Sequence, residues 1–105
     1  MTKDRNLTIT RDGGLLRLTC RGELDLTTED ALVQGVGSAL EAGDVTAVMA
    51  DLVDVSFMDS SGLRALLMCR ELATARDLAF SISACSPPVR RLLEVAGVTD
   101  WFAYE

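Results

Sequence analysis

The sequence predicts an α/β domain with a mixed, mostly parallel sheet of about five strands, in the order β-β-α-β-α-β-α-β. The first observation is that strand-like segments alternate with segments whose apolar residues recur at helical spacing. The second is that only the first two strand-like segments are joined by a tight turn, so they alone should pair antiparallel, whereas strands joined through helices pair in parallel. The 105 residues suit one domain spanning 1–105.

The chain begins with the predicted hairpin. Residues Leu7–Arg11 alternate between apolar and polar, as a half-buried strand does. The tripeptide Asp12–Gly14 supplies the turn, and Leu15–Arg21 resumes the alternation.

A loop and the first helix are predicted next. Gly22–Leu26 is expected to be a loop, and Thr27 is expected to cap the helix. Glu29 and Asp30 would lie in its first turn, where carboxylates suit the helix dipole. The helix should end near Gly43, and its apolar stripe consists of Leu32, Val36, Ala39 and Leu40.

The second half of the chain alternates strands and helices. Val45–Leu52 is a β-branched apolar run, as expected of a strand covered on both faces. A second helix is predicted from Ser60, with its apolar face formed by Gly62, Ala65, Leu66, Cys69, Leu72 and Ala73.

The remaining elements are a strand, a short helix and a last strand. Leu78–Ala84 is the next predicted strand. Ser86 should cap a helix that opens on two prolines and closes at Gly97, with Val89, Leu92, Leu93 and Ala96 as its buried stripe. Trp101–Tyr104 is predicted to be the fifth strand.

The chain is acidic, with 16 Asp and Glu against 10 Lys and Arg and a formal net charge of −6. No Lys or Arg occurs between Arg21 and Arg64. Non-specific nucleic-acid binding depends on neutralising phosphates with basic side chains, so no nucleic-acid partner is expected. A positively charged protein surface would instead be drawn to the acidic stretch; the simpler interpretation is a solvated acidic face.

Composition excludes several chemistries. The chain has no His, so a Ser-His-Asp triad and an imidazole zinc site are both impossible, and no metal or other cofactor is predicted. Its three widely spaced residues Cys20, Cys69 and Cys85 fit reduced, buried thiols in a cytosolic protein. No signal-peptide pattern is present, and no apolar run approaches the roughly 20 residues of a membrane span, so no membrane insertion is expected.

The segment Asp51–Leu63 is the most informative for function, because it joins a buried strand to a helix. Ligands and modifications gather at that end of the strands in open α/β sheets. Asp59 is predicted to be the N-cap, which leaves Ser60 and Ser61 in the first turn. Free N–H groups there would favour an anion, so a phosphate on Ser60 would be tolerated.

Helical spacing gives Ser60 apolar neighbours. Ser60, Leu63, Arg64 and Leu67 fall on one face at i, i+3, i+4 and i+7. Partly exposed leucines beside a modifiable hydroxyl suit a switchable protein contact. Alternatively, the third helix covers both leucines.

These residues resemble a known family. Gly22-Glu23-Leu24-Asp25, followed by Phe57-Met58-Asp59-Ser60-Ser61-Gly62-Leu63, is similar to the STAS domain of bacterial anti-sigma factor antagonists. The resemblance covers nearly the whole chain, including the element order and the stretch Ser86–Leu93.

The resemblance implies the STAS fold and a partner-switching role in the control of transcription. It implies that an anti-sigma factor, which is a serine kinase of the GHKL ATPase type, phosphorylates Ser60. The unmodified antagonist would bind the anti-sigma factor and free the sigma factor for a stress response. A PP2C-type phosphatase would restore the binding form. The implied partner-binding residues are Glu23, Asp25, Asp59, Ser60, Ser61, Gly62, Leu63, Arg64 and Leu67.

The chain departs from the family pattern at two points. The position of Arg64 is often a small residue in the family, and an Arg there could pair with an acidic partner residue or with a phosphate on Ser60. Many members also continue into a C-terminal helix, which we expect to be absent or shortened after Glu105.

Two other classes of function are considered. An enzyme is not expected: Asp25, Asp51, Asp54 and Asp59 could form a metal cluster, but Ser60 lacks a base and a receiver-like domain would need a late Lys. The second alternative is a non-switching STAS interaction module, such as a soluble subunit of a lipid transporter or a signalling scaffold.

Overall fold

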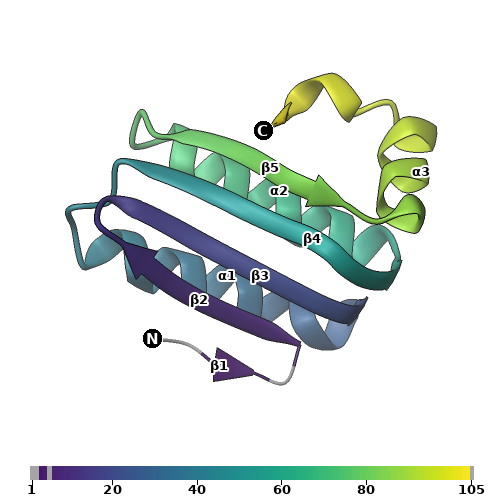
Figure 1. Cartoon of the computed structure of the whole chain (residues 1–105), viewed down its shortest axis with the longest axis horizontal. Helices are drawn as coiled ribbons and strands as arrows, with labels where there is room; N and C mark the ends of the chain where they lie inside the picture. Colours follow the sequence, from purple (N-terminus) through teal and green to yellow (C-terminus); the bar gives the residue numbers. More distant parts are fainter. Residues whose placement is uncertain (1–2, 5, 105) are drawn as a thin grey trace.

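The computed structural model describes residues 3–4 and 6–104, which form one sheet and its helices (Figure 1). The sheet has the order β1-β2-β3-β4-β5-β6. Its strands are β1 (Lys3–Asp4), β2 (Leu7–Asp12), β3 (Leu15–Leu24), β4 (Ala47–Met58), β5 (Ala79–Cys85) and β6 (Ala103–Tyr104). The helices are α1 (Leu26–Glu41), α2 (Ser60–Thr74) and α3 (Pro87–Ala96), followed by the 3₁₀ turn η1 (Thr99–Trp101).

The predicted mixed, mostly parallel sheet is confirmed. β2 pairs antiparallel with β1 and β3, whereas β3, β4, β5 and β6 pair in parallel along the sheet. The prediction of about five strands was wrong, because only the four strands from β2 to β5 are full-length. Trp101 belongs to the 3₁₀ turn, which leaves two residues of the predicted last strand for the sheet edge.

The two central strands are longer than predicted. The first three residues of the expected loop Gly22–Leu26 are the end of β3, and its last residue begins α1. β4 continues six residues past Leu52 to Met58. Their parallel pairing continues through register shifts between Thr19 and Arg21 and between Gly22 and Glu23. These irregularities break the period-two pattern, which is why alternation alone did not detect the extension.

Helices α1 and α2 lie beside each other on one face of the sheet, behind it in Figure 1. Between them and the strands lies the core, which includes Leu18, Ala50, Val36 and Leu66. Helix α3 sits at the end of the sheet where β3, β4 and β5 terminate (Figure 1). The carboxyl ends of the parallel strands, the start of α2 and helix α3 therefore share one end of the molecule.

The burial of each cysteine side chain affects the pKa of its thiol. Burial raises the pKa of Cys20 and of Cys69 to about 12. Cys85 is only partly buried, and burial raises its pKa as well. All three are free thiols, as the sequence predicted.

The N-cap of α1 differs from the prediction. Asp25, not Thr27, caps the helix: its Oδ1 accepts the Thr27 N–H at 3.0 Å, and Thr28 Oγ1 accepts the Asp25 N–H at 2.9 Å. This reciprocal capping box satisfies two backbone donors at once, and the helix begins two residues earlier than a Thr27 cap would allow.

Gly62 allows α2 to approach the sheet closely. A Cβ at this position would collide with the carbonyl oxygen of Leu24 and come within 2.9 Å of Met58 Cγ. The carbonyl is backbone and cannot swing away, so only glycine fits at this contact.

We predict opposite effects for two Gly-to-Ala substitutions. Gly62→Ala should lower the free energy of unfolding by about 1–3 kcal/mol, because the collision forces α2 away from β3. Gly37→Ala should raise it by about 0.5–1 kcal/mol, because Gly37 is in the interior of α1 and an added Cβ meets nothing within 4 Å. Urea unfolding of the two variants measures both effects, and equal stability of Gly62→Ala and the wild type would contradict the close approach.

Candidate functional site

The candidate site lies where the β3–α1 and β4–α2 connections meet. The Asp59 N–H donates to the Leu24 carbonyl at 3.3 Å, and Gly62 packs against the same carbonyl. Asp25 directly follows Leu24, so the N-caps of α1 and α2 are held at adjoining positions. The structure therefore brings together the two motifs that the sequence showed 34 residues apart, Gly22–Asp25 and Asp59–Gly62.

Asp59 occupies the start of α2 as predicted. Its Oδ1 accepts the N–H groups of Ser61 at 2.9 Å and Gly62 at 3.1 Å, and its carbonyl accepts the Leu63 N–H at 3.0 Å. The expectation of free N–H groups that would favour an anion is therefore wrong at these three positions. The carboxylate of Asp59 already supplies the negative charge that the helix N-terminus attracts.

Ser60 presents its side chain to solvent at the first position of α2. Ser61 is half-buried and Gly62 is buried beneath it. Leu63 and Leu67 are half-buried and pack on the edge of the core, so both keep an exposed part on the Ser60 side of the helix. Met68, next along, is 40% exposed.

Arg64 is tied to the neighbouring helix. Its Nε donates to Glu29 Oε2 at 2.8 Å and its Nη2 donates to Glu29 Oε1 at 3.0 Å, a two-bond pairing of guanidinium and carboxylate. The hydrogen bond from Arg64 lowers the pKa of Glu29, and the Glu29 carboxylate raises the pKa of Arg64. The sequence analysis considered an acidic residue of a partner protein or a phosphate on Ser60 as the group that pairs with Arg64. In the unmodified chain Arg64 pairs with Glu29 instead.

Three acidic residues flank the starts of α1 and α2. Glu23 is exposed at the end of β3, and Asp25 and Asp59 are half-buried at the two helix starts. The Thr27 hydroxyl, which donates to Asp25 at 2.6 Å, lowers the pKa of Asp25, and the Thr27 backbone N–H lowers it further. These carboxylates give the site a negative rim at neutral pH.

An apolar hollow adjoins this site, and the sequence analysis did not single it out. Phe57 and Val95 border it and are 49% and 79% exposed. It has a volume of about 310 Å³ and lies between β4 and α3, with Met58, Pro88, Arg91 and Leu92 completing its lining. The exposed Phe57, two residues before Asp59, was the sequence signal that could have found it.

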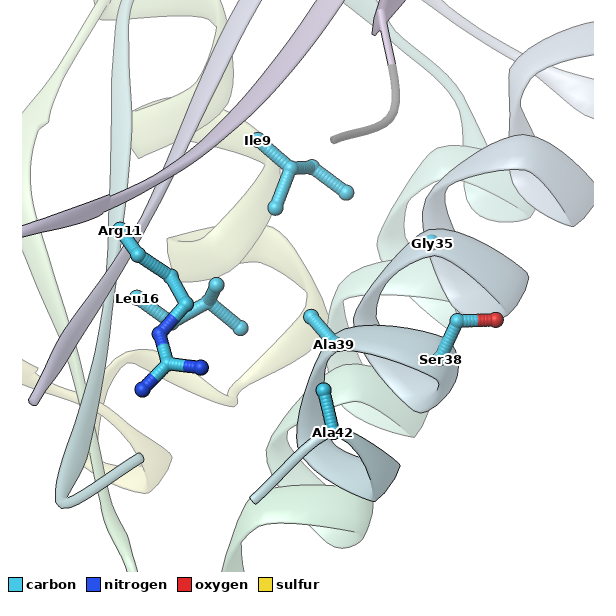
Figure 2. Close-up of a pocket in the computed structure, with 7 residues that line it drawn as sticks. All are labelled: Ile9, Arg11, Leu16, Gly35, Ser38, Ala39 and Ala42. Carbon is cyan, nitrogen blue, oxygen red and sulfur yellow. The ribbon is translucent and has the colours of Figure 1, made fainter. Parts of the chain in front are cut away.

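A second hollow lies away from the serine, between α1 and the strands β2 and β3 (Figure 2). It has a volume of about 240 Å³. Small helix residues, among them Gly35 and Ala39, leave space opposite Ile9 and Leu16, and Arg11 extends along one side. The lining of this hollow shares no residue with the predicted site.

Two further features bear on function. In residues 3–4 and 6–104, no three His, Cys, Asp or Glu side chains lie close enough together to hold a metal ion, so Asp25, Asp51, Asp54 and Asp59 do not form the cluster considered above. No helix in this part of the chain has the length and apolar character to cross a membrane.

Comparisons with known proteins agree with the fold and the motifs. The STAS domain family model matches residues 6–105, and the chain belongs to this family. An anti-sigma F factor antagonist of Paenibacillus polymyxa is 31% identical over 85 residues, which cover 81% of this chain and 73% of that relative.

Two solved structures share the fold. The anti-sigma factor antagonist SpoIIAA in its unphosphorylated form has a TM-score of 0.81 at 23% identity, covering 94% of this chain and 87% of that one. The Bacillus cell fate determinant SpoIIAA in its phosphorylated form has a TM-score of 0.75 at 22% identity, covering 94% of this chain and 90% of that one. The predicted STAS resemblance is thus confirmed.

We predict that the Glu29–Arg64 pair stabilises the fold at neutral pH and loses its effect in acid. Because the folded-state pKa of Glu29 lies below its ordinary value, the contribution is complete above the ordinary glutamate pKa of about 4.3 and is lost as the pH falls through the lower, folded-state pKa. Glu29→Gln and Arg64→Gln should each unfold at lower urea concentration than the wild type at pH 7, and the deficit should shrink toward pH 3.

Glu71→Gln, which alters an exposed glutamate on α2, is the matched control for this series. A deficit of equal size at pH 7 and pH 3 in the Glu29→Gln variant would show that the pair contributes packing and no charge interaction.

Proposed function

We propose that the protein is an anti-sigma factor antagonist whose binding is switched by phosphorylation of Ser60. In this proposal the unmodified chain binds an anti-sigma factor of the GHKL serine-kinase type and thereby frees a sigma factor. The kinase transfers a phosphoryl group from ATP to Ser60 and the complex dissociates. A PP2C-type phosphatase returns the chain to its binding form. The chain itself acts as substrate and ligand, with no catalytic role.

The observation that carries the proposal is the exposed Ser60 at the acid-rimmed start of α2. A kinase must reach the hydroxyl oxygen, and the first position of a helix at the end of a sheet presents it without local unfolding. The family membership and the name of the Paenibacillus relative support the same function.

The proposed partner surface combines charge with apolar contacts. Its acidic members are Glu23, Asp25 and Asp59, so the partner should present basic side chains. Leu63 and Leu67 supply apolar area beside Ser60, and we extend the surface to the exposed Phe57. Ser61, Gly62 and Arg64 complete it, Gly62 by holding the helix in place and Arg64 through its exposed guanidinium edge.

Charge explains how the modification would release the partner. A phosphate adds about −1.5 to −2 charges at pH 7, next to carboxylates that are already negative. The N–H groups of Ser61, Gly62 and Leu63 already donate to Asp59, so they cannot compensate it without giving up the cap. A hundredfold loss of affinity requires about 2.7 kcal/mol, and one misplaced charge at a closed interface can supply that.

The proposal places the protein in the bacterial cytoplasm, because sigma factors act there on RNA polymerase. The reduced state of its three free thiols fits that compartment.

We predict that the partner is captured only by chains with a neutral residue 60. Wild type and Ser60→Ala, used as baits in host lysate, should retain a GHKL-type anti-sigma kinase, and Ser60→Asp should lose it at least tenfold. The retained kinase, once purified, should phosphorylate the wild type with ATP at Ser60 and leave Ser60→Ala unmodified, as mass spectrometry would show.

The exposed Ser38 on α1, which is outside the proposed surface, offers the matched controls Ser38→Ala and Ser38→Asp, and both should retain the kinase. If Ser61→Asp loses the kinase and Ser60→Asp retains it, the switch is at Ser61, and this result would contradict the proposal. Retention of transporter or scaffold subunits by every bait alike would make the chain a non-switching interaction module.

A further inference from the structure

A phosphate on Ser60 would add to the negative charge of the site, and the backbone N–H groups of the next three residues are already engaged. The three N–H groups that follow Ser60 donate to the side chain and carbonyl of Asp59. The rim adds the carboxylates of Glu23 and Asp25. A positively charged side chain within reach would therefore pair favourably with a dianion placed here.

Arg64 is the cation placed to do so. It lies four residues after Ser60 on α2, so the two side chains are neighbours on one face, and both are exposed. Helical side chains lean toward the N-terminus of their helix, which directs Arg64 back toward Ser60.

The guanidinium of Arg64 also has capacity for a second partner. It carries five N–H donors, and the pairing with Glu29 uses one on Nε and one on Nη2. The Arg64 side chain is 63% exposed, whereas that of Glu29 is 11% exposed, so the edge turned away from Glu29 is open to solvent. Phosphate suits that planar fork as well as a carboxylate does and carries more charge.

We propose that Arg64 is the intramolecular receptor for phosphorylated Ser60, and that Glu29 holds the guanidinium in place while the serine is unmodified. On modification, the phosphate draws Arg64 wholly or partly away from Glu29. The negative charge of the surface still rises by the full charge of the phosphate, because Arg64 changes partner without adding charge. Arg64 thereby stabilises the phosphorylated state without restoring partner binding.

The proposal rests on the proposed modification of Ser60, but its test does not need the kinase. Phosphoserine is incorporated at position 60 of the full chain during translation, and its titration is followed by phosphorus NMR. An unperturbed phosphoserine has a second pKa of about 6. A cation that binds the dianion lowers this pKa, and removing the cation reverses the effect.

We expect the second pKa of the phosphoserine to be lower in the wild-type chain than in Arg64→Gln, by about half a pH unit. Glu29→Gln, which releases Arg64, should give a value equal to or below that of the wild type. Arg70→Gln is the matched control: Arg70 is on the same helix but donates to the Trp101 carbonyl at 2.6 Å, and its loss should leave the titration unchanged.

An identical phosphoserine titration in the wild type and in folded Arg64→Gln would overturn the proposal. A second measurement covers the case in which Arg64→Gln does not fold. The Nε–H signal of Arg64, observed in the otherwise unaltered chain, should shift when residue 60 is phosphoserine, and an unchanged signal would also overturn the proposal. Failure to capture a kinase, by contrast, would count against the proposed function. The phosphoserine titration and the Arg64 Nε–H signal would still test the pairing of Arg64 with the phosphate.

Discussion

The site depends on one close contact, the approach of Gly62 to the carbonyl of Leu24. That contact sets α2 against the end of β3, and the hydrogen bond from Asp59 to the same carbonyl holds the preceding residue. The start of α2 and the start of α1 are consequently fixed relative to each other. Ser60 is then exposed while the residues on either side of it are held by hydrogen bonds, a combination that few surface loops provide.

The charges around Ser60 follow from how the two helices are capped. Each helix begins with an aspartate that satisfies its own backbone donors, Asp25 in α1 and Asp59 in α2. The same side chains that stabilise the helices therefore make the surface negative and leave the N-terminus of α2 with little capacity for a further anion. The two aspartate caps therefore account both for the stability of the helix starts and for the proposed sensitivity of partner binding to phosphate.

The sequence was sufficient for the fold class, the positions of the three helices and the Asp59 cap. Those features depend on local signals: apolar spacing, proline at the start of α3 and glycine after its end. It was insufficient where the outcome depended on contacts between distant segments. The extension of β4 to Met58 follows from pairing with β3, and the pairing of Arg64 with Glu29 joins residues 35 positions apart. No period or motif in a single sequence encodes such contacts. The Asp25 cap was missed for a different reason, because a competing local candidate, Thr27, lay two residues away.

The central claim is that phosphorylation of Ser60 acts through local charge on an unchanged backbone. Amide proton–nitrogen NMR spectra of the unmodified chain and of the chain carrying phosphoserine at position 60 test it most directly. The account predicts signal changes confined to the first two turns of α2 and the adjoining starts of α1 and ends of β3 and β4, with the rest of the sheet unmoved. Changes that run the length of α2 into β5 would show that the helix is remodelled and would contradict the account.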